Sequence, residues 1–163
     1  LCIDTKTGKR LWEIDFPKEF KTPVPSFGCV CSPMVDDKYV YMQAGAAFCK
    51  IEQDTGKMVW QSMKDKGGMY DSAFSSPVFA TIRDKEQILV QSRTELAGVD
   101  IDSGGVLWRQ PIKAFRGMNI LTPLPYDNGV YTSAYGGRSH FFGIKRDQQS
   151  WKSAEQWENK GQA

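Results

Sequence analysis

"EQDTGKMVW" at residues 52–60 is a polar turn followed by a short apolar stretch that ends on a tryptophan. "DTKTGKRLW" (4–12) and "DIDSGGVLW" (100–108) repeat this pattern. The tryptophans that mark the repeat, including a fourth copy near the C-terminal end, are Trp12, Trp60, Trp108 and Trp157. They lie 48, 48 and 49 residues apart, and such even spacing predicts a repeated structural unit.

The first three copies carry the same chemistry at the same distances before the tryptophan. The residues four positions before it are glycines: Gly8, Gly56 and Gly104. A hydroxyl residue lies five positions before it and an acid eight positions before it. Glycine adopts positive φ in a hairpin turn at little cost, and a hydroxyl can hydrogen-bond the turn's backbone. Tryptophan offers a large apolar surface to a neighbouring unit, so we interpret these residues as a structural docking motif.

A second landmark alternates with the first. Ser or Thr followed by proline begins an apolar run at three places: Pro33, Pro77 and Pro123. A turn signal and another strand-like run follow each of them, and "DNG" at 127–129 is a strong hairpin signal. The unit around Trp60 is predicted to hold four strands, at 31–35, 39–43, 47–52 and 57–62.

Four short strands in a period of 40–50 residues predict an all-β fold, a β-propeller of four-stranded antiparallel blades. About three and a half blades are expected here, from a ring of about seven or eight. Their predicted ranges are 1–16 for the end of one blade, 31–62 and 75–110 for two blades, and 120–159 for a blade with an atypical last strand. Residues 153–161 have some helical propensity, but we interpret them as a strand because they hold Trp157 at the repeat position. A helical solenoid would need helical patterns that are missing.

Composition excludes several classes of partner. The 163 residues carry a net charge of +2, which gives no reason to expect nucleic acid. No stretch approaches the about 20 apolar residues that span a bilayer. The sequence does not begin with Met, so we expect a piece of a longer protein, and an open set of blades is expected to associate. The four cysteines lack zinc-site spacing and are interpreted as small buried strand residues, so no metal site is predicted.

The spaced acid, hydroxyl, glycine and tryptophan resemble the tryptophan-docking motif of the pyrroloquinoline-quinone (PQQ) type of propeller, over essentially the whole chain. The copy around Trp157 lacks the glycine and the hydroxyl at matching offsets, which predicts a different or longer turn there. The family includes quinoprotein dehydrogenases, which hold a quinone and calcium, and cofactor-free scaffolds of the BamB-like kind. The motif is common to both, so it indicates fold rather than function.

The resemblance implies a non-catalytic interaction or assembly scaffold, periplasmic or otherwise extracytoplasmic. It would bind a protein or peptide partner and the remaining blades of its parent chain, without a cofactor. The alternative is a fragment of a PQQ-dependent alcohol or sugar dehydrogenase, with PQQ and calcium. Such enzymes carry adjacent cysteines, whereas this chain has Cys29-Val-Cys31, and no acidic cluster is assignable to calcium. The scaffold is therefore favoured.

Function is expected on the face opposite the Thr-Gly turns. Successive loops of a meander alternate ends, so the loops at 43–48, 93–98 and 135–140 share a face with the links at 16–28, 64–74 and 113–119. The candidate binding residues there are Tyr70, Asp71, Arg93, Glu95, Arg116, Asn119, Tyr135, Arg138 and His140. The arginines suit a carboxylate, a phosphate or a peptide backbone. The alternative is a loop ion pair of Arg93 with Glu95 and otherwise solvated side chains, and no catalytic residue is predicted.

Overall fold

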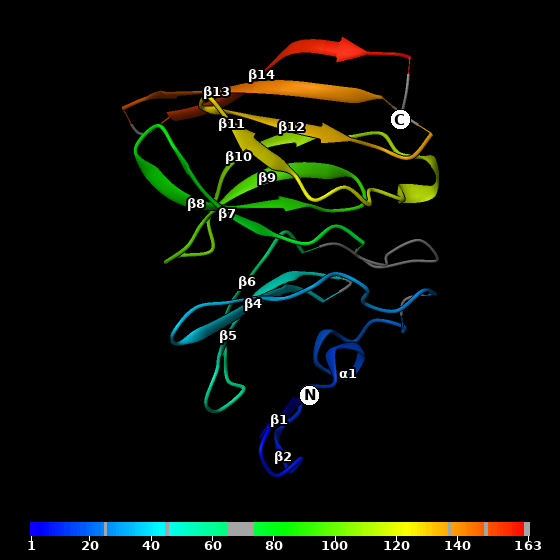
Figure 1. Ribbon diagram of the computed structural model, residues 1–163, viewed down its shortest axis with the longest axis vertical. Coiled ribbons are helices and arrows are strands. Elements are labelled where there is room, and N and C mark those ends of the chain that lie inside the picture. Colours follow the sequence, from blue (N-terminus) through cyan, green and yellow to red (C-terminus); the bar gives the residue numbers. More distant parts are fainter. Residues whose placement is uncertain (25, 45, 65–73, 137, 149, 162–163) are drawn as a thin grey trace.

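Four antiparallel sheets lie one after another along the long axis of the molecule (Figure 1). The computed structural model describes residues 1–24, 26–44, 46–64, 74–136, 138–148 and 150–161. The first sheet pairs β1 (Cys2–Ile3) with β2 (Arg10–Trp12). The second sheet contains β3 (Met34–Val35), β4 (Tyr39–Gln43), β5 (Phe48–Glu52) and β6 (Met58–Ser62). The third contains β7 (Val78–Ile82), β8 (Lys85–Gln91), β9 (Glu95–Asp100) and β10 (Val106–Pro111). The fourth contains β11 (Leu124–Tyr126), β12 (Gly129–Ser133), β13 (Ser139–Asp147) and β14 (Ser150–Asn159).

Strands dominate the described residues, which confirms the all-β prediction. The stretch with helical propensity near the C-terminal end forms most of β14, as predicted. Two short helical turns, α1 (Phe16–Phe20) and η1 (Phe115–Gly117), lie in links between sheets. The first was not predicted; Pro17 lies in its first turn, and the side chain of Asp15 caps it by accepting from the Lys18 amide. Among the described residues, no helix is both long enough and apolar enough to cross a membrane.

Each sheet places its tryptophan at the same point of the hydrogen-bond register. A one-residue bulge precedes every marked tryptophan: Leu11, Val59, Leu107 and Gln156 are the extra residues. Trp60 then faces Lys50, and Trp108 faces Gly98, ten residues earlier in both cases. Trp157 faces Phe141, sixteen residues earlier, so its hairpin is six residues longer. The fourth hairpin therefore differs, as predicted, but its strands are longer and not its turn, because β13 ends at Asp147 and β14 begins at Ser150.

Two of the tryptophans lie on the glycine of the next sheet. The indole N–H of Trp12 donates to the carbonyl oxygen of Gln53 at 2.7 Å, and a Cβ added to Gly56 would lie 2.7 Å from its ring. Trp60 repeats the arrangement with the carbonyl of Ile101 at 3.2 Å and with Gly104, whose added Cβ would lie 2.6 Å from the ring. These glycines are thus needed for a close approach as well as for their φ of 75° and 72°.

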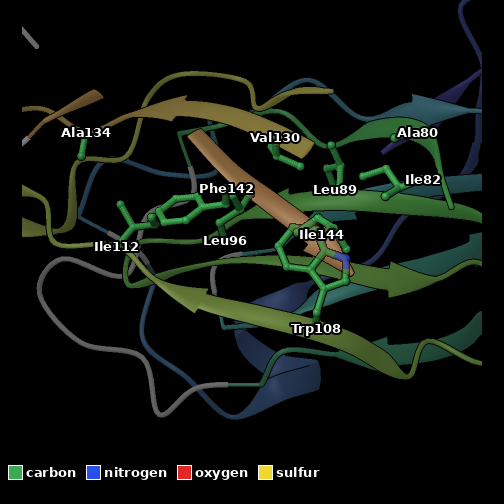
Figure 2. Close-up of a cluster of buried hydrophobic side chains, with 10 residues drawn as sticks. All are labelled: Ala80, Ile82, Leu89, Leu96, Trp108, Ile112, Val130, Ala134, Phe142 and Ile144. Carbon is green, nitrogen blue, oxygen red and sulfur yellow. The ribbon is translucent and has the colours of Figure 1, made fainter. Parts of the chain in front are cut away.

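Trp108 packs differently, because the long β13–β14 hairpin offers no glycine turn. Its indole N–H donates to Oε1 of Gln87 in its own sheet at 2.7 Å. The indole is 3% exposed and lies between the third and fourth sheets (Figure 2). Ile144 and Phe142 of the fourth sheet belong to the same buried cluster. At this junction the indole therefore packs into an apolar cluster, and its N–H is satisfied within its own sheet.

A partly buried ion pair braces the turn between β9 and β10. Lys85 Nζ lies 2.7 Å from the Asp100 carboxylate, which also accepts from the backbone and hydroxyl of Ser103. These donors, led by Lys85, hold the pKa of Asp100 well below its usual value. Because the folded-state pKa of Asp100 is lower than its unfolded-state pKa of about 3.9, the ionised carboxylate stabilises the fold at pH values above about 3.9. This stabilisation is lost progressively as the pH falls below about 3.9 toward the folded-state pKa.

We expect Asp100→Asn to unfold at lower urea than the parent at pH 7, with the gap closing below about pH 4. Lys85 is 33% exposed and solvent screens the pair, so the expected gap is about 1 kcal/mol. Urea titrations between pH 7 and pH 2.5 measure it, with Asp102→Asn as a charge-matched control. A gap that stays constant across this range would contradict the ion-pair account.

Candidate functional site

The links between sheets and the Thr-Gly turns lie at opposite ends of the sheets. Figure 1 shows η1 and its link at the right, and the turn between β9 and β10 at the left. Two predicted loops, 93–98 and 135–140, were wrong in extent. β9 begins at Glu95 and β13 begins at Ser139, because the chain reverses in tight turns before these residues. Two predicted binding residues, Glu95 and His140, therefore lie on strands.

A pocket of about 530 Å³ opens beside the link that follows β10. It is formed between the end of β10 with the link that follows it and strands β13 and β14 of the fourth sheet. The charged and aromatic residues that line it include Lys113, Phe115, Arg138, His140, Glu155 and Glu158. Two of the predicted binding residues, Arg138 and His140, are thus brought together with two carboxylates of β14.

Ion pairs order the side chains of this pocket. Arg138 Nη1 lies 2.5 Å from Glu158 Oε1, and His140 Nδ1 lies 2.6 Å from Glu155 Oε1. The Arg138 guanidinium holds the pKa of the Glu158 carboxyl below its usual value. The imidazole of His140 stacks on Phe142 at 5.4 Å, which fixes the plane of the ring. Arg138 and Glu155 are each 45% exposed and can reach a partner from this position.

Sequence reasoning missed both glutamates, for a structural reason. Residues three apart on a regular strand point to opposite faces. The bulge at Gln156 adds one residue between Glu155 and Glu158, so both side chains fall on the face of His140. Trp157 then points to the other face of the sheet. An irregularity of register on β14 thus builds the acidic half of the pocket.

Two further predicted residues lie at the rim of the pocket. The Tyr135 ring packs edge-on against Phe115 at 6.2 Å, and the Arg116 guanidinium lies 5.1 Å from the same ring. Phe115 and Tyr135 are 52% and 53% exposed. The backbone N–H of Phe115 donates to the Tyr135 carbonyl at 2.8 Å, which ties η1 to the turn before β13. Phe115, an apolar residue in a polar link, was not predicted.

The other predicted residues lie elsewhere. Asn119 is 1% exposed, and its Nδ2 donates to the Ser92 carbonyl at 2.9 Å, so it fastens the link to the third sheet. Glu95 lies 3.5 Å from Arg109 on β10, and Arg93 is half-buried in the turn before β9. Tyr70 and Asp71 fall outside the described residues. Of the nine candidates, Arg116, Tyr135, Arg138 and His140 therefore adjoin the pocket.

The pocket's donor set does not fit calcium. Atoms of His140, Glu155 and Glu158 lie within 4.8 Å of one another, but one is an imidazole nitrogen and both carboxylates hold protein partners. Calcium takes about six to eight oxygen ligands. The cysteines are free thiols: Cys31 and Cys49 are buried, whereas Cys29 is exposed, which corrects the expectation that all are buried. Burial raises the pKa of the Cys49 thiol to about 12.

Comparison with known proteins agrees with this architecture. The family model described as outer membrane protein assembly factor BamB matches residues 1–162. The outer membrane protein assembly factor BamB of Francisella salina is 29% identical over 112 residues, 68% of this chain and 19% of that protein. The crystal structure of BamB from Moraxella catarrhalis superposes with a TM-score of 0.70 at 19% identity, over 98% of this chain and 45% of that one.

The structural likeness confirms the predicted β-propeller fold, of which this chain holds a part. The chain spans 19% of the Francisella protein and 45% of the Moraxella chain. The family model covers nearly every residue, including all four marked tryptophans. The chain belongs to the BamB family of PQQ-like repeat β-propellers.

Proposed function

We propose that this chain is part of a non-catalytic scaffold that binds a protein partner outside the cytoplasm during outer membrane protein assembly. The name of the matching family and of the Francisella relative, outer membrane protein assembly factor BamB, supports the assembly role and with it a place outside the cytoplasm. The observation that carries the binding role is the pocket around Arg138, His140, Glu155 and Glu158. The tryptophan–glycine contacts lie at the end of the sheets that carries the Thr-Gly turns, and the pocket lies at the opposite end.

The chemistry of the pocket suits a polypeptide. Pockets for small molecules are lined predominantly by apolar side chains, with few polar groups. Here Lys113 and Arg138 offer positive charge and Glu155 and Glu158 offer negative charge within one pocket. An extended segment that carries both signs of charge can exchange with these ion pairs without leaving a charge unpaired.

The rim adds apolar contact to this charge pattern. Aromatic residues and arginine dominate the binding energy of protein interfaces. Phe115 and Tyr135 form an exposed aromatic pair, and Arg116 and Arg138 flank it. A partner segment with one apolar side chain between charged ones is therefore the expected occupant.

Site-specific cross-linking tests this proposal in cells that produce the full-length protein. A photoreactive amino acid at Tyr135 is expected to capture an outer membrane assembly protein, and Arg138→Ala is expected to reduce the adduct several-fold. The matched control is the same probe at Lys57, an exposed residue of the turn at the opposite end of the sheets. Equal adducts from both positions, or an adduct insensitive to Arg138→Ala, would refute the proposed binding face.

The dehydrogenase alternative has less support. In the pocket one possible ligand is an imidazole and both carboxylates are held in ion pairs, which supports a cofactor-free protein over the dehydrogenase. Dye-linked oxidation of alcohols by the full-length protein supplied with PQQ and calcium is expected to stay at the rate without protein. Turnover that needs both additives would restore the alternative.

A further inference from the structure

Three possible metal ligands meet on one face of the fourth sheet, between β13 and β14. They are His140, Glu155 and Glu158, and one ligand atom of each lies within 4.8 Å of the others. His140 is the one histidine in the 163 residues. The end of β10 lines the same pocket, so this group lies at a junction between two sheets of the described structure.

The pairing of β13 with β14 sets the spacing within this group. His140 pairs directly with Glu158, and Phe142, two residues further along β13, pairs with Glu155. Directly paired residues of antiparallel strands have Cβ atoms about 4.5–5.5 Å apart. The bulge at Gln156 then brings Glu155 to the same face. All three side chains therefore project from paired strands, which hold ligands more precisely than loops do.

The imidazole of His140 is already oriented within this group. It stacks on Phe142 with 14° between the two ring planes, and its Nδ1 lies 2.6 Å from Glu155 Oε1. The His140 side chain is 15% exposed, against 45% for Glu155 and 25% for Glu158. The ring is thus held by the protein, and the two carboxylates are more open to the pocket.

We propose that His140, Glu155 and Glu158 bind a zinc ion, with water as the fourth ligand. Calcium and magnesium take oxygen ligands, whereas an imidazole nitrogen among carboxylates suits zinc. Zinc lies about 2.0–2.2 Å from such nitrogen and oxygen atoms in a tetrahedral site, which sets the ligand atoms about 3.3 Å apart. Atoms that already lie within 4.8 Å reach this spacing by small side-chain rotations. The pocket of about 530 Å³ leaves room for the water.

Arg138 supplies positive charge to this group in the metal-free protein. Its Nη1 lies 2.5 Å from Glu158 Oε1, and its side chain is 45% exposed, so it can turn toward the pocket opening. Two positive groups on one carboxylate repel each other. Zinc and Arg138 therefore compete for Glu158, and the ion releases the guanidinium when it binds.

The ion acts on the pocket as a regulator of partner binding. With zinc bound, Glu155 and Glu158 no longer offer negative charge to a partner, whereas Arg138 is available to a partner carboxylate. This regulation rests on the proposed function, but zinc binding itself does not. Calorimetry on the purified protein measures the zinc site and the cross-link at Tyr135 measures the partner, so failure of one is distinguishable from failure of the other.

Isothermal titration calorimetry of zinc chloride into the purified full-length protein tests the site, after a chelator has removed bound metal. His140→Ala and Glu158→Gln are each expected to weaken zinc binding at least about tenfold. Arg138→Ala is expected to tighten zinc binding several-fold, because the competing cation is lost. A role for Arg138 in merely holding the pocket together predicts the opposite sign. Circular dichroism checks that each variant is folded.

Glu13→Gln is the matched control, because Glu13 also forms an ion pair with an arginine. Arg10 Nη1 lies 2.6 Å from Glu13 Oε2, beside β2 and outside the zinc group, so zinc binding is expected to stay at the parent value. Cobalt(II) gives a second readout, since its visible absorption reports tetrahedral coordination, and His140→Ala is expected to abolish the band. No zinc binding by the parent, equal binding by the parent and His140→Ala, or weaker binding by Arg138→Ala would each overturn the proposal.

Discussion

Replacing Trp108 with alanine is expected to lower the free energy of unfolding by about 3–5 kcal/mol, the range for truncation of a buried tryptophan. The indole is 3% exposed and packs with Ile144 and Phe142 across the junction of the third and fourth sheets (Figure 2). The substitution also leaves Gln87 Oε1 without its donor in a fully buried position. Such a loss is a large share of the stability of an ordinary domain.

Trp157→Ala is the matched control, because it removes the same side chain at the same register position. Trp157 is 46% exposed, so the expected cost is below about 1.5 kcal/mol when the protein is dilute enough to be monomeric. Urea unfolding followed by far-UV circular dichroism measures both variants. Equal losses would show that burial at the sheet junction does not set the contribution of these tryptophans.

The second large effect is expected from Gly104→Ala. A Cβ at Gly104 would lie 2.6 Å from the Trp60 ring, so the ring must leave its place on the turn. Overpacking of this kind costs about 1–3 kcal/mol, and an L residue at a φ of 72° adds about 1–2 kcal/mol. Together the expected loss is about 3 kcal/mol.

Gly8→Ala separates the two causes. Gly8 has nearly the same φ, 68°, in the same type of turn, but an added Cβ would meet nothing within 4 Å. It is expected to cost the backbone strain alone, about 1–2 kcal/mol. Thermal and urea unfolding of the two variants gives the difference. A loss from Gly8→Ala as large as that from Gly104→Ala would remove the tryptophan contact as the reason for glycine.

The repeat was predictable because its residues meet local needs. Gly56 and Gly104 are required by their positive φ, and Trp60 is required by its large apolar ring. The same residue types therefore recur at a constant spacing, and this spacing can be recognised in the sequence. Hairpins with two residues at positive φ, such as Asp127 and Asn128, are equally local, and that one was predicted. The strand character of residues 150–159 followed from the period rather than from propensity.

Features that depend on neighbouring sheets were not predictable. Gln43 Nε2 donates to the carbonyls of Ser75 and Gln91. The residues around Gln43 in the sequence do not indicate these two hydrogen bonds. Asn119 reads as an exposed loop residue but is buried against Ser92. Such contacts join segments about 30 residues apart in the sequence. Local patterns of apolar and polar residues predict strands and turns but do not predict these contacts.

The candidate site was half predictable for the same reason. The positions of Arg138 and His140 followed from the alternation of loop ends, which is a property of any meander. Their partners Glu155 and Glu158 depend on the bulge at Gln156, which the sequence does not show. The charged pocket could therefore be identified only from the register of β14.

Hydrogen exchange at the tryptophan indoles tests most directly that these residues hold neighbouring sheets together. In deuterated buffer, NMR is expected to show slow loss of the Nε1–H signals of Trp12, Trp60 and Trp108, which donate to Gln53, Ile101 and Gln87. Trp157, 46% exposed, is expected to exchange at least tenfold faster in the dilute monomer. Equal, fast exchange at all four indoles would contradict the account.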